Sequence, residues 1–321
     1  MALSMKRGRW LAAPILALAV PAAVITTTVA ASAATTHTTR HVPHASQAFV
    51  APAGLDHFLC YRATLNPKSK PGFKIPPNLQ LTDQFATFTP RFGPVTEHCN
   101  PALKQVVLPT GGIMSYPPKS PSWHYLCWQI TAPVPQPIFT VKVTNQFGSA
   151  ELTGEQPNQF CLPSLKSLVT PPVYQKPGKG EIKPDHLTCY PVKPVAGKPG
   201  FAPPGPVSVG DEFNGFKPQP IQVLQPTELC LPTEKTINGV VAAPIKHPKA
   251  HLQCFAITPP TPVISPIWDK NQFGAGQLVI APASASTSEN LCLPSAKKVV
   301  KIVLPPGPSR GAPLAIRLGR G

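Results

Sequence analysis

The chain has 321 residues, among them 46 prolines and 22 glycines, and carries a formal net charge of +16. Because proline lacks an amide donor and breaks helix interiors, this content excludes long helices, whereas 42% hydrophobic residues predict a packed core and not a disordered chain. The basic residues are spread thinly, with no run of four. This pattern argues against nucleic-acid binding. A diffuse positive charge can attract an anionic cell-wall or surface polymer, which is one candidate partner; the alternative is that the charge serves solubility alone.

Residues 1–33 have the three-part form of an export signal. Three basic residues precede an apolar run that ends in small residues at Ala33. We expect cleavage after Ala33 or Ala34; two prolines within the apolar run argue against the alternative of an uncleaved membrane anchor. Residues 34–54 are predicted to be a disordered linker, and no later stretch is apolar enough to span a membrane. The protein is therefore predicted to be secreted or held at the cell surface.

One set of three motifs recurs four times after this leader. The motifs are His-x2-Cys-aromatic, then Asp/Asn-Gln/Glu-Phe, then Cys-x-Pro-x2-Lys, and the copies start 67, 62 and 65 residues apart. Such a period indicates a tandem structural unit, and the copies are numbered repeats 1 to 4. Their members are His57, Cys60, Tyr61, Asp83, Gln84, Phe85, Cys99, Pro101 and Lys104; His124, Cys127, Trp128, Asn145, Gln146, Phe147, Cys161, Pro163 and Lys166; His186, Cys189, Tyr190, Asp211, Glu212, Phe213, Cys230, Pro232 and Lys235; His251, Cys254, Phe255, Asn271, Gln272, Phe273, Cys292, Pro294 and Lys297.

All eight cysteines belong to the repeats, two in each, so one disulfide within each repeat is the simplest pairing. Each bridge would stabilise a small module by about 3–4 kcal/mol, and export supplies the oxidising conditions. The alternative is a zinc site of one histidine and two cysteines. It is disfavoured because His57 and Cys60, three apart on a strand, would face opposite sides. The predicted pairs are Cys60–Cys99, Cys127–Cys161, Cys189–Cys230 and Cys254–Cys292.

The predicted fold class is all-β, with four tandem small disulfide-bonded modules, each resembling a β-sandwich or a barrel. The proline-rich segments between copies are expected to be semi-rigid spacers. Two alternatives are an extra strand that docks modules in pairs and a closed four-bladed propeller. The predicted strands include 80–85, 139–147, 206–213, 277–281, 106–108 and 299–304. The predicted boundaries are modules at 55–108, 122–170, 184–241 and 249–304, with a basic tail at 305–321.

The repeated residues are given structural roles. The phenylalanine of the central motif is predicted to lie in the core, and the Asp or Asn two positions before it is predicted to form a turn through its side chain. The proline of the last motif suits an edge strand or a strand end. The lysine five residues after the second cysteine is interpreted as a solvated strand end. On the first strand, the residue two before the cysteine shares the cysteine's face, and the histidine and the aromatic residue share the other.

The three motifs together resemble a repeat family of exported bacterial proteins that is catalogued only as a domain of unknown function. The strings His-x2-Cys-Tyr, Asp-Gln-Phe and Leu-Cys-x-Pro-x2-Lys carry the resemblance, which covers nearly the whole mature chain. It implies no activity, cofactor or catalytic residue. The chain departs from the pattern in repeat 1, where His98 and Asn100 stand in place of two leucines, and in repeat 3, where Glu212 stands in place of glutamine.

No motif marks an enzyme. The 13 acidic residues offer no well-placed carboxylate pair, no phosphate-binding glycine loop occurs, and the thiols are used in bridges. A match to the nucleophile-elbow string at 307–311 lies in the basic tail with no helix predicted after it. We therefore expect no catalytic residue, cofactor or metal, and an extracellular or cell-surface binding or structural protein of unknown partner. The alternative is a secreted hydrolase whose site is assembled between modules.

Overall fold

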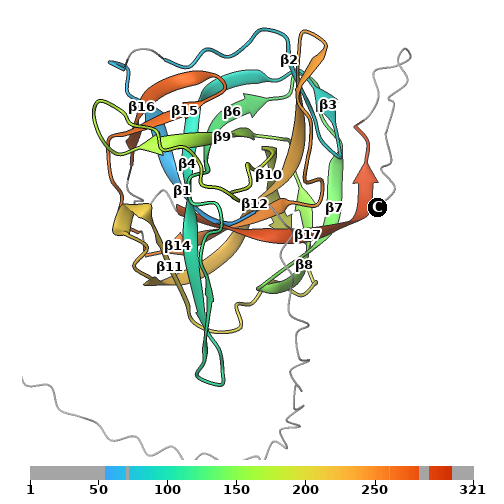
Figure 1. The fold of residues 1–321 in the computed structure, drawn as a ribbon. Helices are drawn as coiled ribbons and strands as arrows, with labels where there is room; N and C mark the ends of the chain where they lie inside the picture. The colour runs from blue at the N-terminus through green and yellow to red at the C-terminus, as the bar shows by residue number, and fades with distance from the viewer. Residues whose placement is uncertain (1–54, 70–71, 260, 282–288, 306–321) are drawn as a thin grey trace, which may run out of the picture. The chain divides into compact units, whose positions relative to one another are not determined.

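The computed structural model describes residues 55–69, 72–259, 261–281 and 289–305 (Figure 1). The predicted export signal, the linker and residues 306–321 of the basic tail lie outside the described residues. The described chain is all-β, as predicted: seventeen strands join in one antiparallel sheet, with no α-helix and one turn of 3-10 helix, η1 (Glu212–Asn214). Among these residues, no helix is long and apolar enough to cross a membrane.

Each repeat contributes two long strands, one for each cysteine, and a shorter central segment between them. The strands are, in repeat 1, β1 (His57–Leu65), β2 (Leu79–Thr82), β3 (Thr87–Phe88), β4 (Arg91–Val107) and β5 (Ile113–Tyr116); in repeat 2, β6 (His124–Thr131), β7 (Ile138–Asn145), β8 (Gly148–Gly154) and β9 (Gln159–Ser167); in repeat 3, β10 (His186–Pro194), β11 (Val207–Asp211), β12 (Gln219–Ile237) and β13 (Val240–Ala243); in repeat 4, β14 (His251–Thr258), β15 (Ile267–Asn271), β16 (Gly274–Ile280) and β17 (Glu289–Val303).

The eight cysteine-bearing strands pair in a closed ring. The order of pairing is β1, β4, β6, β9, β10, β12, β14, β17 and again β1. Each second strand thus pairs with the first strand of the next repeat. This pairing gives hydrogen-bond partners to backbone N–H and C=O groups that would be unpaired at the edge of a separate module. The repeats therefore share one sheet, which differs from the predicted arrangement of separate tandem modules joined by spacers.

The central segments tie together repeats that are two apart. β2 pairs with β12, β7 with β17, β11 with β4, and β15 with β9. The long second strands change partner to make these contacts, and the proline of each Cys-x-Pro motif lies at the change. On β4, for example, pairing with β6 ends at Cys99 and pairing with β11 begins at Ala102, with Pro101 between them. The prediction of a strand end at this proline is therefore wrong, because the strand continues past it to a new neighbour.

The interior of the ring is filled by the four disulfides. They are Cys60–Cys99, Cys127–Cys161, Cys189–Cys230 and Cys254–Cys292, the same pairs that the repeat predicts. In each bond the two cysteines are direct cross-strand partners, so every bridge joins the two long strands of one repeat. As predicted from strand periodicity, the residue two before each first cysteine lies with the sulfurs. These residues are Phe58, Tyr125, Leu187 and Leu252.

The outer face of the ring is covered by the central segments, and a second apolar layer forms there. The predicted turns are confirmed: in every repeat the side-chain oxygen of the Asp or Asn accepts a hydrogen bond from the backbone N–H of the phenylalanine two residues later, at 2.7–2.9 Å. Three of the four phenylalanines are buried, and Phe85 is partly buried. The predicted solvation of the lysines is wrong for three of the four repeats. Because side chains alternate along a strand, a lysine five residues beyond an inward-facing cysteine points to the outer face, which the central segments cover. Lys104, Lys166 and Lys235 are buried there.

Candidate functional site

The repeats meet at four equivalent junctions, each built from the lysine of one repeat and the central motif of the next. The lysine nitrogen lies over the ring of the following repeat's phenylalanine, 4.4–5.2 Å from its centroid, which is a cation–π geometry. The last repeat contacts the first, so the set closes on itself like the strand ring. The pairs are Lys104 with Phe147, Lys166 with Phe213, Lys235 with Phe273 and Lys297 with Phe85.

The junction between repeats 2 and 3 differs from the other three, which carry glutamine at the equivalent position of the central motif. Lys235 and Lys297 each donate to the glutamine of the adjoining central motif, Gln272 and Gln84. At the junction between repeats 2 and 3, which we call junction 2/3, Glu212 occupies the glutamine position and forms an ion pair with Lys166 at 3.0 Å. Its carboxylate also lies 3.9 Å from Nε2 of His124.

A cleft opens at junction 2/3. It has a free volume of about 470 Å³, within the usual range for small-molecule sites. Its polar lining includes Ser122, His124, Lys166, Gln175 and Glu212, and its apolar lining includes Leu168, Val169, Val173 and Phe216. The Lys166 side chain is 1% exposed and lies at the base of this lining, whereas the Glu212 side chain is 42% exposed.

The sequence of the central segment of repeat 3 explains why Phe216 reaches the cleft. Asp211 caps the short helix η1, and Gly215 ends it in the left-handed conformation with φ of 67°. Phe216 follows with φ of 57°, a costly backbone conformation for a residue with a large side chain. Its N–H donates to the carbonyl of Asp211 at 2.6 Å, which holds the aromatic ring beside Glu212 in the cleft wall.

The base of the cleft continues into a buried polar network. Lys166 Nζ donates to Oδ1 of Asn100 at 2.7 Å, and Asn100 Nδ2 donates to Oδ2 of Asp211 at 2.8 Å. His98 Nε2 lies 2.9 Å from the same Asn100 oxygen, and its Nδ1 lies 3.2 Å from Oδ2 of Asp269. Both His98 and Asp269 have no exposed surface. The network thus links residues from all four repeats.

The network gathers the three residues that depart from the repeat pattern. His98 and Asn100 replace leucines on β4, Glu212 replaces glutamine beside β11, and all three come together around Lys166. Sequence reasoning identified the three departures but did not predict that they meet. It missed Lys166, Asp269 and Phe216. The strict recurrence of the lysine at one spacing from a cysteine was the available signal, because a merely solvated residue has no reason to keep that spacing.

Burial shifts the pKa values of the titratable groups in this cluster. Burial lowers the pKa of Lys166, although the Glu212 and Asp211 carboxylates oppose the shift. Burial, together with the charges of Lys166 and His98, holds the pKa of His124 well below its ordinary value. Burial raises the pKa of Asp211, and hydrogen bonds from Asn100 and Tyr61 act against it. The lowered pKa keeps the His124 imidazole neutral at neutral pH, and the contact with Lys166 at 3.0 Å holds the Glu212 side chain in place.

The groups that face the cleft suit recognition of a ligand rich in hydroxyl groups. Glu212 supplies an oriented acceptor, Gln175 supplies an amide, and Phe216 supplies an aromatic ring against which C–H groups can pack. Ser122 already donates to Oε1 of Glu181 at 2.9 Å, and its oxygen remains a potential acceptor. No cysteine lines this cleft, and all eight cysteines of the chain form disulfides.

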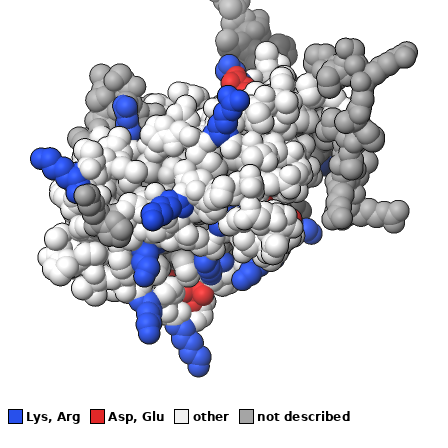
Figure 2. All heavy atoms as spheres, turned by 90° about the horizontal axis from the view of Figure 1, so that it is seen from above, with Lys and Arg blue, Asp and Glu red and all other residues white. Residues whose placement is uncertain are grey.

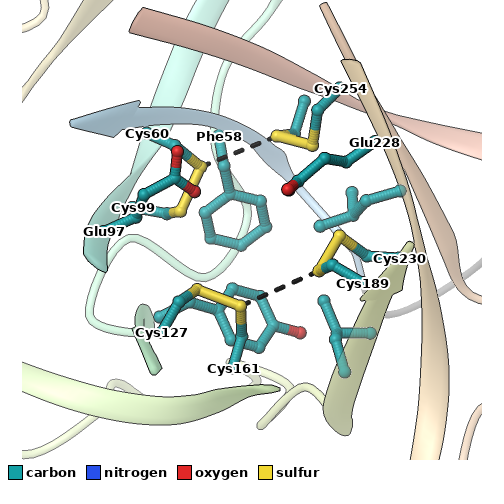
Figure 3. Close-up of a pocket in the computed structure, with 14 residues that line it drawn as sticks. Phe58, Cys60, Glu97, Cys99, Cys127, Cys161, Cys189, Glu228, Cys230 and Cys254 are labelled. Carbon is teal, nitrogen blue, oxygen red and sulfur yellow. Dashed lines mark hydrogen bonds between the residues drawn. A yellow bond between two sulfur atoms is a disulfide. The ribbon is translucent and has the colours of Figure 1, made fainter. Parts of the chain in front are cut away.

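The interior of the ring is a different kind of space. The four disulfides, two glutamates and four apolar side chains line it, and only about 10 Å³ remains free (Figure 3). An organic ligand or a cofactor does not fit in that volume. The sulfurs are not thiolates, so the grouping of each glutamate with a cysteine pair is not a zinc site, in line with the preference for disulfides over zinc.

Comparison with known proteins gives no relative: no protein-family model, no curated protein and no solved structure matches the chain.

Proposed function

We propose that the protein is an exported binding protein whose cleft at junction 2/3 binds a hydroxyl-rich ligand, such as an oligosaccharide of a cell surface. The observation that carries the proposal is the convergence of His98, Asn100 and Glu212 at one junction, beside a cleft of about 470 Å³. The four junctions occupy equivalent places in the ring. Residues that break the equivalence, and do so together, are better explained by recognition than by folding.

Two further observations support an extracellular setting. Four disulfides are typical of proteins from oxidising compartments. On the face drawn in Figure 2, lysine and arginine side chains are separated by uncharged surface, with few acidic groups among them. Such a field attracts an anionic cell-wall polymer without reading its structure. Selectivity in this proposal comes from the cleft.

The test is binding of the full chain to a panel of neutral and acidic oligosaccharides, measured by calorimetry for the wild type and Glu212→Gln. Glutamine occupies the same position in the other three repeats, where it bonds either the lysine or the histidine of the adjoining repeat, so this variant should fold. Loss of a charge-assisted hydrogen bond to the ligand should weaken binding by roughly 10- to 100-fold. The matched control is Gln272→Glu, which places the carboxylate at the junction between repeats 3 and 4 and should leave the affinity unchanged.

Several results would overturn the proposal: no oligosaccharide binds, Glu212→Gln binds as tightly as the wild type, or both variants lose affinity equally. Cleavage of the oligosaccharide during the assay, detected by mass spectrometry, would instead favour a secreted hydrolase with its site between repeats.

A further inference from the structure

One lysine and one asparagine lie together in a buried place where their side chains can react with each other. Lys166 on β9 donates from Nζ to Oδ1 of Asn100 on β4 at 2.7 Å. Nζ is therefore no more than about 4 Å from the carbonyl carbon Cγ, because a C=O bond is about 1.2 Å long. Holding an amine against a carbonyl group at contact distance removes much of the entropic barrier to reaction between them.

The asparagine occurs at this position in one repeat, whereas the lysine occurs in all four. The residue after the second cysteine is Asn100 in repeat 1 and leucine in the others, Leu162, Leu231 and Leu293. Asn100 has no exposed surface, and neither has His98 two residues before it. Replacing a buried leucine by a polar side chain costs desolvation energy. The asparagine therefore calls for a role that belongs to this junction.

The surroundings of Lys166 allow its amine to become neutral, as a nucleophile must be. The side chain is 1% exposed, and Nζ lies 4.4 Å from the centroid of the Phe213 ring. Burial lowers the pKa of the amine, although the nearby carboxylates oppose the shift. Glu212 lies 3.0 Å from Nζ with its side chain 42% exposed, so it can accept the proton and pass it to solvent.

His98 lies at the oxygen on which negative charge develops during the reaction. When the amine attacks Cγ, the electron pair of the C=O bond moves to Oδ1 of Asn100. His98 Nε2 is 2.9 Å from that oxygen and can donate to it, while Nδ1 is 3.2 Å from Oδ2 of Asp269. Ser164 donates to the same Asp269 oxygen at 2.8 Å. Asp269 thus orients the imidazole that stabilises the charged intermediate.

Asp211 lies at the nitrogen that leaves. Its Oδ2 accepts from Nδ2 of Asn100 at 2.8 Å and from the hydroxyl of Tyr61 at 2.7 Å. Burial raises the pKa of Asp211, which allows its carboxyl group to hold a proton. The carboxyl group gives this proton to Nδ2 as the C–N bond breaks, and it takes one back from the attacking nitrogen. One amide bond forms, one breaks and ammonia leaves, so the step needs no oxidant or reductant.

We propose that Lys166 and Asn100 join through an amide bond between Nζ and Cγ, with release of ammonia. All four disulfides lie within single repeats, whereas this bond ties repeat 2 to repeat 1. The buried position of Asn100 excludes water, which favours attack by the amine over hydrolysis. Ammonia can leave through the cleft that Lys166 lines. The new amide keeps one N–H that can donate to Glu212, so the bond goes beyond the proposed ligand site and fixes its base.

The test is mass spectrometry of the full mature chain, secreted so that its disulfides form and measured after their reduction. We expect a mass about 17 Da below that calculated from the sequence, which is the mass of one ammonia molecule. Tryptic digestion should give a branched peptide that contains both Asn100 and Lys166, and trypsin should not cut after Lys166. The mass does not depend on oligosaccharide binding, so this proposal and the proposed function can fail separately.

Two variants each remove one reacting group. Asn100→Leu places at this position the leucine of the other repeats and should fold, and Lys166→Met removes the nucleophile. Both should have the full calculated mass. The matched control is Lys235→Met, which replaces the equivalent buried lysine of repeat 3 and should keep the deficit of about 17 Da.

Asp211→Asn tests the proton transfer while keeping the turn. Asn145 and Asn271 fill this position in repeats 2 and 4 and accept the same hydrogen bond from the phenylalanine N–H. Loss of the acid should slow formation of the Asn100–Lys166 bond by roughly 100-fold, so freshly purified variant should yield mainly unbranched peptides. A branched peptide as abundant as in the wild type would show that Asp211 has no part in the step.

Three results would overturn the proposal. The wild type may have its full calculated mass, or Asn100→Leu may keep the deficit. A deficit of about 18 Da would mean that water is lost, so that a carboxyl group and not Asn100 forms the bond.

Discussion

The histidine that opens each repeat should make the protein sensitive to acid, and His251 allows the effect to be isolated. Its ring is 6% exposed, and burial together with the charge of Lys297 lowers its pKa to about 3. The unfolded chain binds a proton at the ordinary pKa of about 6.5, so stability is lost as the pH falls below that value. At pH 5 the difference between the folded and unfolded pKa values lowers the free energy of unfolding by about 2 kcal/mol, whereas at pH 7.5 it lowers it by almost nothing.

His251→Asn removes the titrating group while leaving a side-chain amide that can donate to the carbonyl of Lys249, the present partner of Nδ1 at 2.9 Å. The free energy of unfolding of the variant, relative to that of the wild type, should increase by about 2 kcal/mol when the pH is lowered from 7.5 to 5. Chemical denaturation at the two pH values measures this difference. The control Gln129→Asn changes an exposed, non-titrating residue on an equivalent strand, and its difference from the wild type should be the same at both pH values. If the difference between His251→Asn and the wild type is also the same at both pH values, the reasoning is refuted.

Two further predictions concern the lysines and the disulfides. Lys104 is buried, its Nζ has no hydrogen-bond partner, and burial lowers its pKa to about 7. Lys104→Met should therefore raise the free energy of unfolding by roughly 2–4 kcal/mol at pH 7. This gain should shrink to about 1 kcal/mol at pH 10, because there the lysine of the unfolded chain also loses its proton. Urea denaturation at the two pH values measures it, and a gain independent of pH would contradict the reasoning. Replacing Cys127 and Cys161 by alanine opens a bridge across 34 positions and should lower stability by about 3–4 kcal/mol at neutral pH. An unchanged denaturation midpoint would show that the bridge does not constrain the unfolded chain.

Much of the local structure could be predicted because it depends on neighbours in the sequence. The turn at Asp211 requires only a side-chain oxygen two residues before Phe213, and the face shared by Phe58 and Cys60 follows from strand periodicity. The cysteine pairs follow from the equality of the repeats. Each of these inferences uses contacts within one repeat.

The closed ring could not be predicted because it depends on contacts between repeats. Nothing near Cys99 in the sequence indicates that β4 pairs with β6 as well as β1, or that β11 continues the sheet beyond Pro101. For the same reason Lys166 looked solvated, since the surface that covers it comes from repeat 3. The departures at His98, Asn100 and Glu212 were visible in the sequence, but the ring is what brings them together.

The most direct test of a specialised junction is to map where an oligosaccharide binds on the isotopically labelled full chain by NMR. Chemical-shift changes should concentrate on the backbone amides around Lys166, Glu212 and Phe216, with little change at the three glutamine-bearing junctions. Equal changes at all four junctions, or changes confined to another surface, would contradict the assignment of junction 2/3 as the binding site.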